Sequence, residues 1–308
     1  MSRDHDHGLP ENSAMDSRLW ASAALNGAIA LAEFLGGLSS GSLALLSDAG
    51  HNLSDVAAVG LALWTRRFSR RPPTLRYTYG FKRAEVLAAL ANAVVLVAIT
   101  VLIAREAFVR LHHPEPIQQG LMLAVALVSL FANVGSVLLL KQHDRDDVNV
   151  RSAFLHMAQD ALASLAVVIA ALVAHTRAGP YMDPAAALVV GLAVLRSALS
   201  LVLETVSTLM EGAPRDADLE AMAARVGHTF PSVRLHHVHV WQNGPGQRLM
   251  TAHVTLDRSL DATAIEAIFG SIKGLLHDEW AITHATLEPE VAGCGETELL
   301  GRWRGTEP

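Results

Sequence analysis

The sequence predicts an α-helical membrane protein with six transmembrane helices, followed by a cytoplasmic α+β domain of ferredoxin-like αββαβ order. Three observations lead to this fold class. Hydrophobic residues make up 51% of the chain and charged residues only 18%, whereas soluble proteins carry about a quarter charged residues. Apolar runs between positions 20 and 210 reach the roughly 20 residues that a helix needs to cross a bilayer. The C-terminal region instead has the alternating pattern of a soluble domain.

Six apolar runs stand in the first part of the chain, at 19–38, 43–65, 84–108, 117–140, 151–175 and 182–208. Arginine and lysine favour the cytoplasmic side of a membrane. The connection between the second and third runs carries seven of them, and that between the fourth and fifth adds Lys141, Arg145 and Arg151. Both termini are therefore expected in the cytoplasm. Compactness and short loops suggest a multi-pass protein of a bacterial inner membrane.

A soluble domain follows the last apolar run. Gly212 and Pro214 interrupt the helical pattern and mark the boundary. The pattern then predicts helices at 216–229 and 261–277 and strands at 233–242, 248–257 and 280–290. The expected divisions are a disordered leader at 1–17, a membrane domain at 18–210, a metal-binding domain at 211–291 and a flexible tail at 292–308.

Several classes of protein are disfavoured by the composition. The net charge of −6 and the absence of a basic stripe with interleaved aromatics argue against nucleic acid as a partner. The single cysteine, Cys294, excludes an intramolecular disulfide framework and a CxxC metal site. The first apolar run lacks a cleavage site and is interpreted as a retained span. No GxxxxGK[ST] motif points to ATP, and no organic cofactor is expected.

Histidine and aspartate recur at helical spacing inside two apolar runs. His51 and Asp55 lie four residues apart in the second run, and His156 and Asp160 repeat that spacing in the fifth. Residues four apart share a helix face, and an ionisable group at the bilayer centre costs about 2.5 to 3.5 kcal/mol. Two imidazoles and two carboxylates suit a tetrahedral Zn²⁺ and balance its charge. The alternative is that the pairs only join helices by hydrogen bonds.

Other polar residues in the apolar runs have weaker assignments. Asp48, one turn before His51, is either an accessory group of the site or, as slightly favoured, a residue in water at the outer end of its span. Arg83 and Glu211 are expected to meet and join the membrane domain to the tail. Further buried polar candidates, expected mostly as helix-packing or pathway groups, are Asn26, Glu33, Asn92, Ser129 and Asn133.

The six-run layout together with "SLALLSDAGHNLSD", "RYTYGFKRAEVLAAL", "NVRSAFLHMAQDALAS" and "HHVHVW" resembles the cation diffusion facilitator family of zinc exporters. The resemblance covers roughly residues 18 to 290. It implies a homodimeric zinc/proton antiporter whose span ligands are His51, Asp55, His156 and Asp160. Some members carry a second metal site in the loop at 66–83, but here that loop has no His, Asp, Glu or Cys.

The resemblance also implies a metal site in the soluble domain. Its ligands would be His236, His253 and His284, between two copies of the chain, with His239 as a fourth. The family often has His-Asp-Leu-His where this chain has "HHVH". Strand alternation places His237 and His239 on one face and His236 on the other. The alternative is that several of these are ordinary half-buried strand histidines.

These observations predict proton-coupled efflux of Zn²⁺, with Cd²⁺ or Co²⁺ as other cargo, by alternating access of the intramembrane site to the two sides. Metal ligands bind in deprotonated form, so zinc binding releases protons. Two other classes remain alternatives. An intramembrane zinc metalloenzyme would keep an open coordination position, which a site with four protein ligands lacks. A membrane-anchored metal sensor leaves the ligands within the bilayer unexplained.

Overall fold

The computed structural model describes residues 13–140, 148–174, 176–256, 260–290 and 298–300. The chain divides into two compact units. The first comprises residues 1–60 and 91–200, and the second comprises 61–90 and 201–308. Three long helices run from one unit into the other, so each unit is described by itself.

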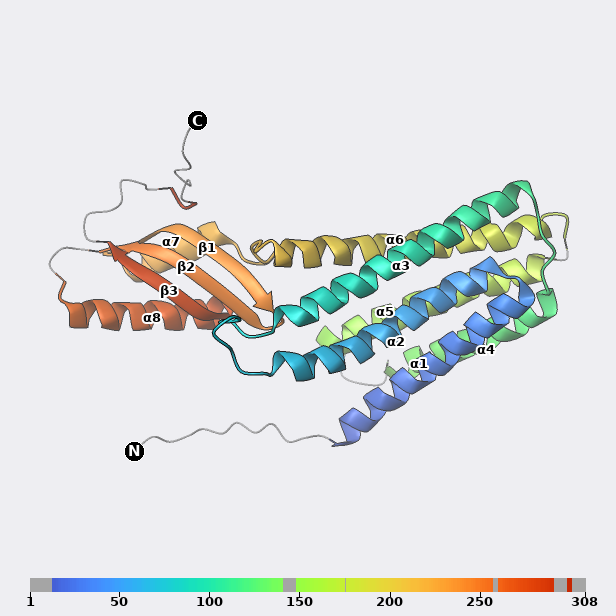
Figure 1. The fold of residues 1–308 in the computed structure, drawn as a ribbon, viewed down its shortest axis with the longest axis horizontal. Helices are drawn as coiled ribbons and strands as arrows, with labels where there is room; N and C mark the ends of the chain where they lie inside the picture. The colour runs from blue at the N-terminus through green and yellow to red at the C-terminus, as the bar shows by residue number, and fades with distance from the viewer. Residues whose placement is uncertain (1–12, 141–147, 175, 257–259, 291–297, 301–308) are drawn as a thin grey trace. The chain divides into compact units, whose positions relative to one another are not determined.

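Six long helices, drawn from blue to yellow in Figure 1, form the first part of the chain. They are α1 (Ser13–Ser40), α2 (Leu43–Ser69), α3 (Arg83–His112), α4 (Gln119–Leu140), α5 (Val148–Val173) and α6 (Gly179–Leu209). Each predicted apolar run contributes most of one helix. Some helices extend beyond their apolar run: α2 continues through Arg66 and Arg67, and α3 continues through Arg110.

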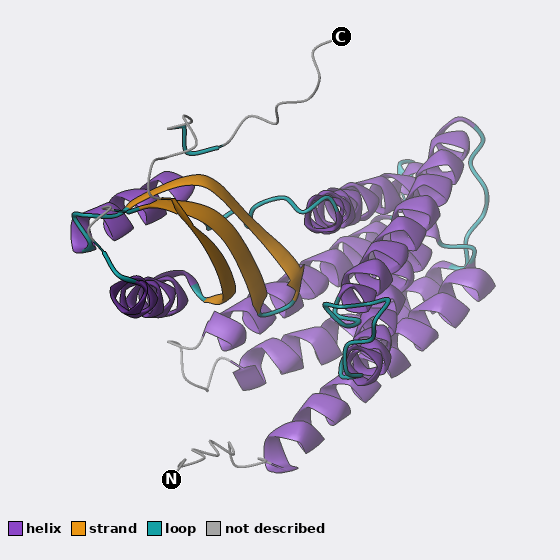
Figure 2. Ribbon diagram, turned by 60° about the vertical axis from the view of Figure 1, so that its left-hand side comes forward, coloured by secondary structure: helices purple, strands orange, loops and turns teal. Residues whose placement is uncertain are grey.

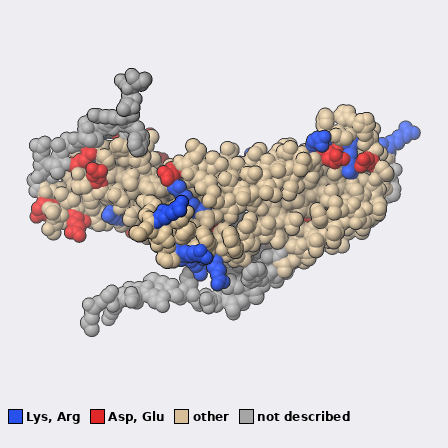
Figure 3. Space-filling view, viewed as in Figure 1, with Lys and Arg blue, Asp and Glu red and all other residues tan. Residues whose placement is uncertain are grey.

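Four of these helices are long and apolar enough to cross a membrane, within the part of the chain that the structure describes: Arg83–His112, Gln119–Leu138, Phe154–Val173 and Gly179–Leu209. The acidic, histidine and arginine residues of α2 make that helix more polar than these four. Large side chains such as Phe131 (71% exposed) and Leu192 (69%) point outward. The helices show a broad uncharged face in Figure 3. Such a surface is expected against lipid rather than water.

Close contacts hold the helices of the first unit together. A Cβ atom at Gly36 of α1 would lie 2.8 Å from Val125 Cγ2 of α4, and one at Gly37 would lie 2.8 Å from Leu46 Cγ of α2. Small residues allow helix backbones to approach in this way. Asp183 of α6 accepts hydrogen bonds from the backbone N–H groups of Leu43 (2.8 Å) and Ala44 (3.2 Å) and from the Ser42 hydroxyl (2.5 Å). It therefore caps the N-terminus of α2.

The C-terminal part of the chain holds α7 (Leu219–Thr229), β1 (Arg234–Gly244), β2 (Gln247–Thr255), α8 (Ala262–Trp280) and β3 (Ile282–Glu290). This αββαβ order is the one that the sequence predicted. The sheet has the strand order β1-β2-β3; β1 and β2 are antiparallel and β2 and β3 are parallel. The hairpin turns at Gly246, whose φ of 67° suits glycine. Asp218 and Asp261 cap the two helices.

Both helices cover the same face of the sheet, as Figure 2 shows. The core on that face contains Met222 and Val226 of α7, Ile272 and Leu276 of α8, and alternate strand residues. Since successive strand side chains point to opposite faces, the residues between these core positions lie on the other face. His253 on β2 belongs to that second face.

A β-bulge in β1 contradicts one prediction from strand alternation. The pairing of β1 with β2 shifts between His236 and His239, and His237 has a φ of 52°. The extra residue changes the alternation, so that Leu235 and Val238 both enter the core. The prediction that His236 faces away from His237 and His239 is therefore wrong. All three lie on the face of His253.

Candidate metal sites

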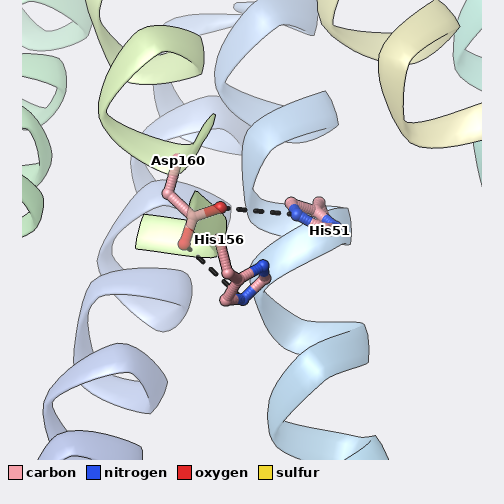
Figure 4. Close-up of side chains that lie close together, drawn as sticks. All are labelled: His51, His156 and Asp160. Atoms are coloured by element: carbon pink, nitrogen blue, oxygen red, sulfur yellow. Dashed lines mark ion pairs between the residues drawn. The ribbon is translucent and has the colours of Figure 1, made fainter. Parts of the chain in front are cut away.

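The first candidate site lies between α2 and α5 in the first unit. His51 belongs to α2, and His156 and Asp160 belong to α5 (Figure 4). Each of these three residues offers a nitrogen or oxygen atom within 4.8 Å of the others. Asp55, one turn after His51, contacts both imidazoles. The structure thus brings together all four residues that the two His-x-x-x-Asp pairs predict.

Three of the four nitrogen–oxygen distances within this group are longer than ordinary hydrogen bonds. His51 Nε2 lies 3.7 Å from Asp55 Oδ2 and 3.4 Å from Asp160 Oδ1. His156 Nε2 lies 3.2 Å from Asp55 Oδ2 and 3.7 Å from Asp160 Oδ2. Two ligands of one tetrahedral Zn²⁺, at about 2.0 Å each from the metal, are separated by about 3.3 Å. The four nitrogen–oxygen distances are near this separation. The two that involve Asp160 use its two different oxygens, and the ligand atoms that all lie within 4.8 Å of one another belong to His51, His156 and Asp160.

Several buried atoms of this group have no hydrogen-bond partner among the described residues: His51 Nδ1, Asp55 Oδ2 and Asp160 Oδ1. Asp160 is 3% exposed. An unpaired buried carboxylate oxygen is costly. A divalent cation placed between the two carboxylates would offset this cost and their mutual repulsion.

Asp48 is not at a water-exposed end of its helix, which corrects the favoured prediction for it. The residue is 1% exposed, and its Oδ2 accepts a hydrogen bond of 3.1 Å from the Ser164 hydroxyl. The physical reason is that Ser164 of α5 and Glu33 of α1 lie against this turn of α2. Asp48 is therefore an inward-facing group, one turn from His51.

The other polar candidates differ in burial. Glu33, Ser129 and Asn133 are at most 5% exposed and belong to a hydrogen-bonded group inside the bundle. Asn92 donates from Nδ2 to the Ser54 hydroxyl at 2.9 Å and so joins α3 to α2. Asn26 is only partly buried. Helix packing accounts for Asn92, whereas the first three surround Asp48 and Ser164.

The second candidate site lies on the sheet face opposite α7 and α8. His253 Nδ1 is 2.7 Å from Glu290 Oε1, and His236 Nε2 is 3.0 Å from Glu290 Oε2. The imidazole rings of His236 and His253 are 5.4 Å apart. These three residues present ligand atoms within 4.8 Å of one another. They are a second group able to hold a metal ion.

Sequence reasoning missed Glu290. The "EPE" ending of β3 carries the signal: Leu287 and Ala285 point into the core, so Glu288 and Glu290 fall on the histidine face. The parallel pairing of His253 with Glu288 brings that end of β3 to the histidines. This register is not visible in the sequence, since it depends on how α8 returns the chain to the sheet.

Two predicted ligands of the C-terminal domain, His239 and His284, are not among the three grouped residues. The His239 ring lies 5.2 Å from that of His237, which in turn lies 4.6 Å from that of His253, so His239 is at the margin of the group. Burial lowers the pKa of His239, and the neighbouring His237 and His253 lower it further. His284 pairs with Leu249. It stands four residues from Glu288, about 13 Å along the strand.

Arg83 and Glu211 meet in the second unit, as the sequence predicted. Arg83 Nη2 lies 2.6 Å from Glu211 Oε1, and Arg83 Nε donates to Asn243 Oδ1 at 3.1 Å. Glu211 has a φ of 61° just after α6. The guanidinium thus connects the start of α3 to the end of α6 and to β1. Cys294 lies outside the described residues.

Long apolar helices with two His-x-x-x-Asp pairs that face each other define a class: helical membrane proteins whose grouped histidines and aspartates could hold a metal ion. The comparisons with known proteins give the family. The family model for the cation efflux transmembrane domain matches residues 19–210. The chain therefore belongs to the cation efflux family.

Three similar proteins match nearly the whole chain. "Zinc transporter ZitB" of Escherichia coli (strain K12) is 41% identical over 96% of this chain and 94% of its own length. "Metal cation efflux system protein CzcD" of Cupriavidus metallidurans is 32% identical, over 97% and 93%. "Cadmium, cobalt and zinc/H(+)-K(+) antiporter" of Bacillus velezensis is 31% identical, over 95% and 93%.

Proposed function

We propose that this protein exports Zn²⁺ from the cytoplasm in exchange for protons, with His51, Asp55, His156 and Asp160 as the transport site. The observation that carries the proposal is that both imidazoles lie 3.2 to 3.7 Å from an oxygen of each of the two carboxylates, which is near the separation of two ligands on one Zn²⁺. The printed names of the relatives, a zinc transporter and a cadmium, cobalt and zinc antiporter, support zinc as cargo and Cd²⁺ or Co²⁺ as alternatives.

The mechanism follows from the chemistry of the ligands. The imidazoles bind metal only as neutral bases and the aspartates only as carboxylates, so a proton bound to any of them competes with zinc. A site that faces the cytoplasm loses its protons and takes up Zn²⁺. The two carboxylates neutralise the ion in a low-dielectric setting. When the site faces the other side, protons replace the metal and return inward.

The membrane arrangement is part of the same proposal. Six long helices and the arginine-rich connection at 66–83 support six spans with both termini in the cytoplasm. The bacterial relatives support the inner membrane as the location. We place the membrane domain at 18–210 and a ferredoxin-like domain at 211–291, and we expect the protein to be a homodimer. The αββαβ order supports that fold.

The tail domain is proposed as a second zinc site, formed by His236, His253 and Glu290. His236 is 2% exposed, and both histidines approach the same carboxylate. His239, at the margin of this group, is the fourth candidate ligand. A ligand role for His284 would require a second copy of the chain to supply it.

Transport into sealed vesicles tests the proposal. The full-length protein in proteoliposomes should move zinc into the lumen when the lumen is acidic, and protons should move out as zinc enters. His51→Ala should abolish zinc flux while the protein stays folded and monodisperse. Zinc-dependent hydrolytic activity without flux would favour the metalloenzyme, and zinc binding without flux would favour the sensor. Either result would overturn the transporter assignment.

A further inference from the structure

Four buried oxygen-bearing side chains form a continuous chain inside the bundle. Glu33 of α1 contacts Ser129 of α4, the Ser129 and Ser164 hydroxyls are 3.0 Å apart, and Ser164 of α5 is 3.1 Å from Asp48 of α2. All four residues are at most 2% exposed. None of them is among the four residues of the proposed transport site.

This chain needs one more hydrogen than its hydroxyl groups contain. Three oxygen–oxygen contacts link Glu33, Ser129, Ser164 and Asp48 in a row, and each hydrogen bond requires one hydrogen. Two serine hydroxyls supply two. The third must come from a carboxyl group, because the remaining nearby donors are used elsewhere.

Those donors are two amides at the sides of the chain. Asn52 Nδ2 donates to Glu33 Oε2 at 2.8 Å, which is the carboxylate oxygen outside the row. Asn133 Nδ2 donates to the Ser164 hydroxyl at 3.3 Å. The Ser164 oxygen is the acceptor in this bond, so it gains no hydrogen that it could donate to Ser129. Neither amide fills the contact between the two serines. The count therefore requires one proton shared by Glu33 and Asp48.

The burial of Asp48 gives an independent reason for a bound proton. Its Oδ1 is buried and accepts no hydrogen bond from an N–H or hydroxyl donor of the described residues, and the Asp48 carboxyl lies within hydrogen-bond reach of the Glu33 carboxyl. A bare carboxylate oxygen in that position is much costlier than the same oxygen in a neutral acid. Two neighbouring buried carboxyls also cannot both be charged at low cost.

We propose that the Glu33–Ser129–Ser164–Asp48 chain stores and relays the counter-transported proton that exchanges with zinc at the metal ligands one helical turn away. This inference rests on the proton exchange proposed above. With the proton on Glu33, each hydroxyl donates toward Asp48. When the Glu33 O–H bond breaks, three hydrogens each move one oxygen along, and an O–H bond forms on Asp48 Oδ2. No proton is gained or lost in this step.

The position of the chain explains how metal and proton exclude each other. Asp48 lies one turn before His51 on α2, and Ser164 lies one turn after Asp160 on α5. Of the charged groups of the metal site, Asp160 acts electrostatically on both Glu33 and Asp48. The α4 segment 119–140 contributes no titratable residue. A divalent ion one turn away in a low-dielectric interior opposes a proton on the chain.

Two acid-to-amide substitutions test the inference in the full-length protein in vesicles. In Glu33→Gln or Asp48→Asn, the new amide N–H supplies the missing hydrogen permanently. Zinc should still bind with an affinity close to that of the wild type, because the metal ligands are intact. Zinc flux driven by a pH gradient should fall about 100-fold, the scale typical of losing a positioned proton-transfer group. Ser136→Ala on α4, whose hydroxyl bonds to Ala132 of its own helix at 3.0 Å, is the matched control.

Infrared spectroscopy provides a readout that does not depend on transport. The wild type without metal should show the carbonyl band of a protonated carboxyl, which disappears when zinc is added and is absent from both amide variants. Survival of the band in both variants, or wild-type proton coupling in both, would show that the chain is not the proton site. Ser129→Ala, which keeps both acids but cuts the relay, decides the matter if either amide variant is unstable.

A failure of the proposed exchange gives a different result. If wild-type zinc flux ignores the pH gradient, the antiport itself is wrong, whatever the variants do. If the wild type is coupled and all three chain variants remain coupled, only the assignment of the proton to this chain is wrong.

Discussion

The two candidate metal sites use similar residues but differ in how their atoms are satisfied. Around His51 and Asp160, nitrogen and oxygen are 3.2 to 3.7 Å apart, and buried atoms lack partners. Around His253 and Glu290, nitrogen and oxygen are within hydrogen-bond distance, at 2.7 and 3.0 Å. The first arrangement is costly until a cation enters, whereas the second is already held together by hydrogen bonds.

This difference teaches what each site is suited to do. In a site whose ligand atoms repel one another or lack hydrogen bonds, binding of a proton or a metal ion lowers the free energy. Protons and metal therefore compete for that site. A site with satisfied ligands must break existing hydrogen bonds before it coordinates a metal. We therefore expect the membrane site to turn over ions and the tail site to respond to zinc with a change in structure.

The largest expected effect is at the membrane site. Asp160→Ala removes the buried one of the two carboxylates and leaves the charge of zinc half balanced. Even outer-shell substitutions cost about 10- to 100-fold in metal affinity, so loss of this ligand should exceed 100-fold and abolish transport. Isothermal titration of zinc into the full-length protein, with Ser136→Ala as control, measures the affinity. Wild-type affinity in Asp160→Ala would refute the four-ligand site.

The next effect separates the two sites. Glu290→Gln keeps the shape of the side chain but removes the charge that both tail histidines approach. We expect about a 100-fold weaker tail affinity for zinc, with the membrane site unchanged. Titration should show two classes of site in the wild type and one high-affinity class in Glu290→Gln. If Glu290→Gln still shows both classes of site, Glu290 is not the zinc ligand of the C-terminal domain and the histidines bind the metal without it. Glu279→Gln, on the far side of the domain, is the control.

A smaller effect is expected for the contact between Arg83 and Glu211. Their side chains are 37% and 61% exposed, and exposed ion pairs contribute about 0.2 to 1 kcal/mol. A double-mutant cycle with Arg83→Ala and Glu211→Ala should give a coupling energy within that range in thermal unfolding. Arg83 also bonds to Asn243, so Arg83→Ala alone should cost more than Glu211→Ala. Purely additive effects would show that the ion pair contributes nothing.

The smallest effect concerns pH. Arg225 holds the pKa of the Glu279 carboxyl below its usual value, and Arg248 does the same for Asp216. A depressed carboxyl pKa in the folded state adds stability at neutral pH, and this is lost as the pH falls through that pKa. The thermal unfolding temperature of the C-terminal domain should therefore fall slightly as the pH is lowered into the acid range. Glu279→Gln should make this dependence on pH less steep. A steeper slope in that variant would reverse the sign of this contribution.

The sequence predicted the helices and strands well because their signals are local. Apolar runs, the breakers near Gly212 and the spacing of His51 to Asp55 each depend on a few neighbouring residues. The burial of Asp48 and the role of Glu290 could not be predicted, since each depends on distant segments. The bulge at His237 illustrates the limit: one residue with a positive φ reverses the faces of the histidines before it, and no residue in "HHVH" announces it.

Asp183 has a consequence for motion within the bundle. Its carboxylate accepts hydrogen bonds from the backbone N–H groups of Leu43 and Ala44 and from the Ser42 hydroxyl. These bonds join the first turn of α2 to the start of α6. Separating them would leave a charged carboxylate and two backbone N–H groups without partners at once. The start of α6 and the first turn of α2 should therefore move as one body.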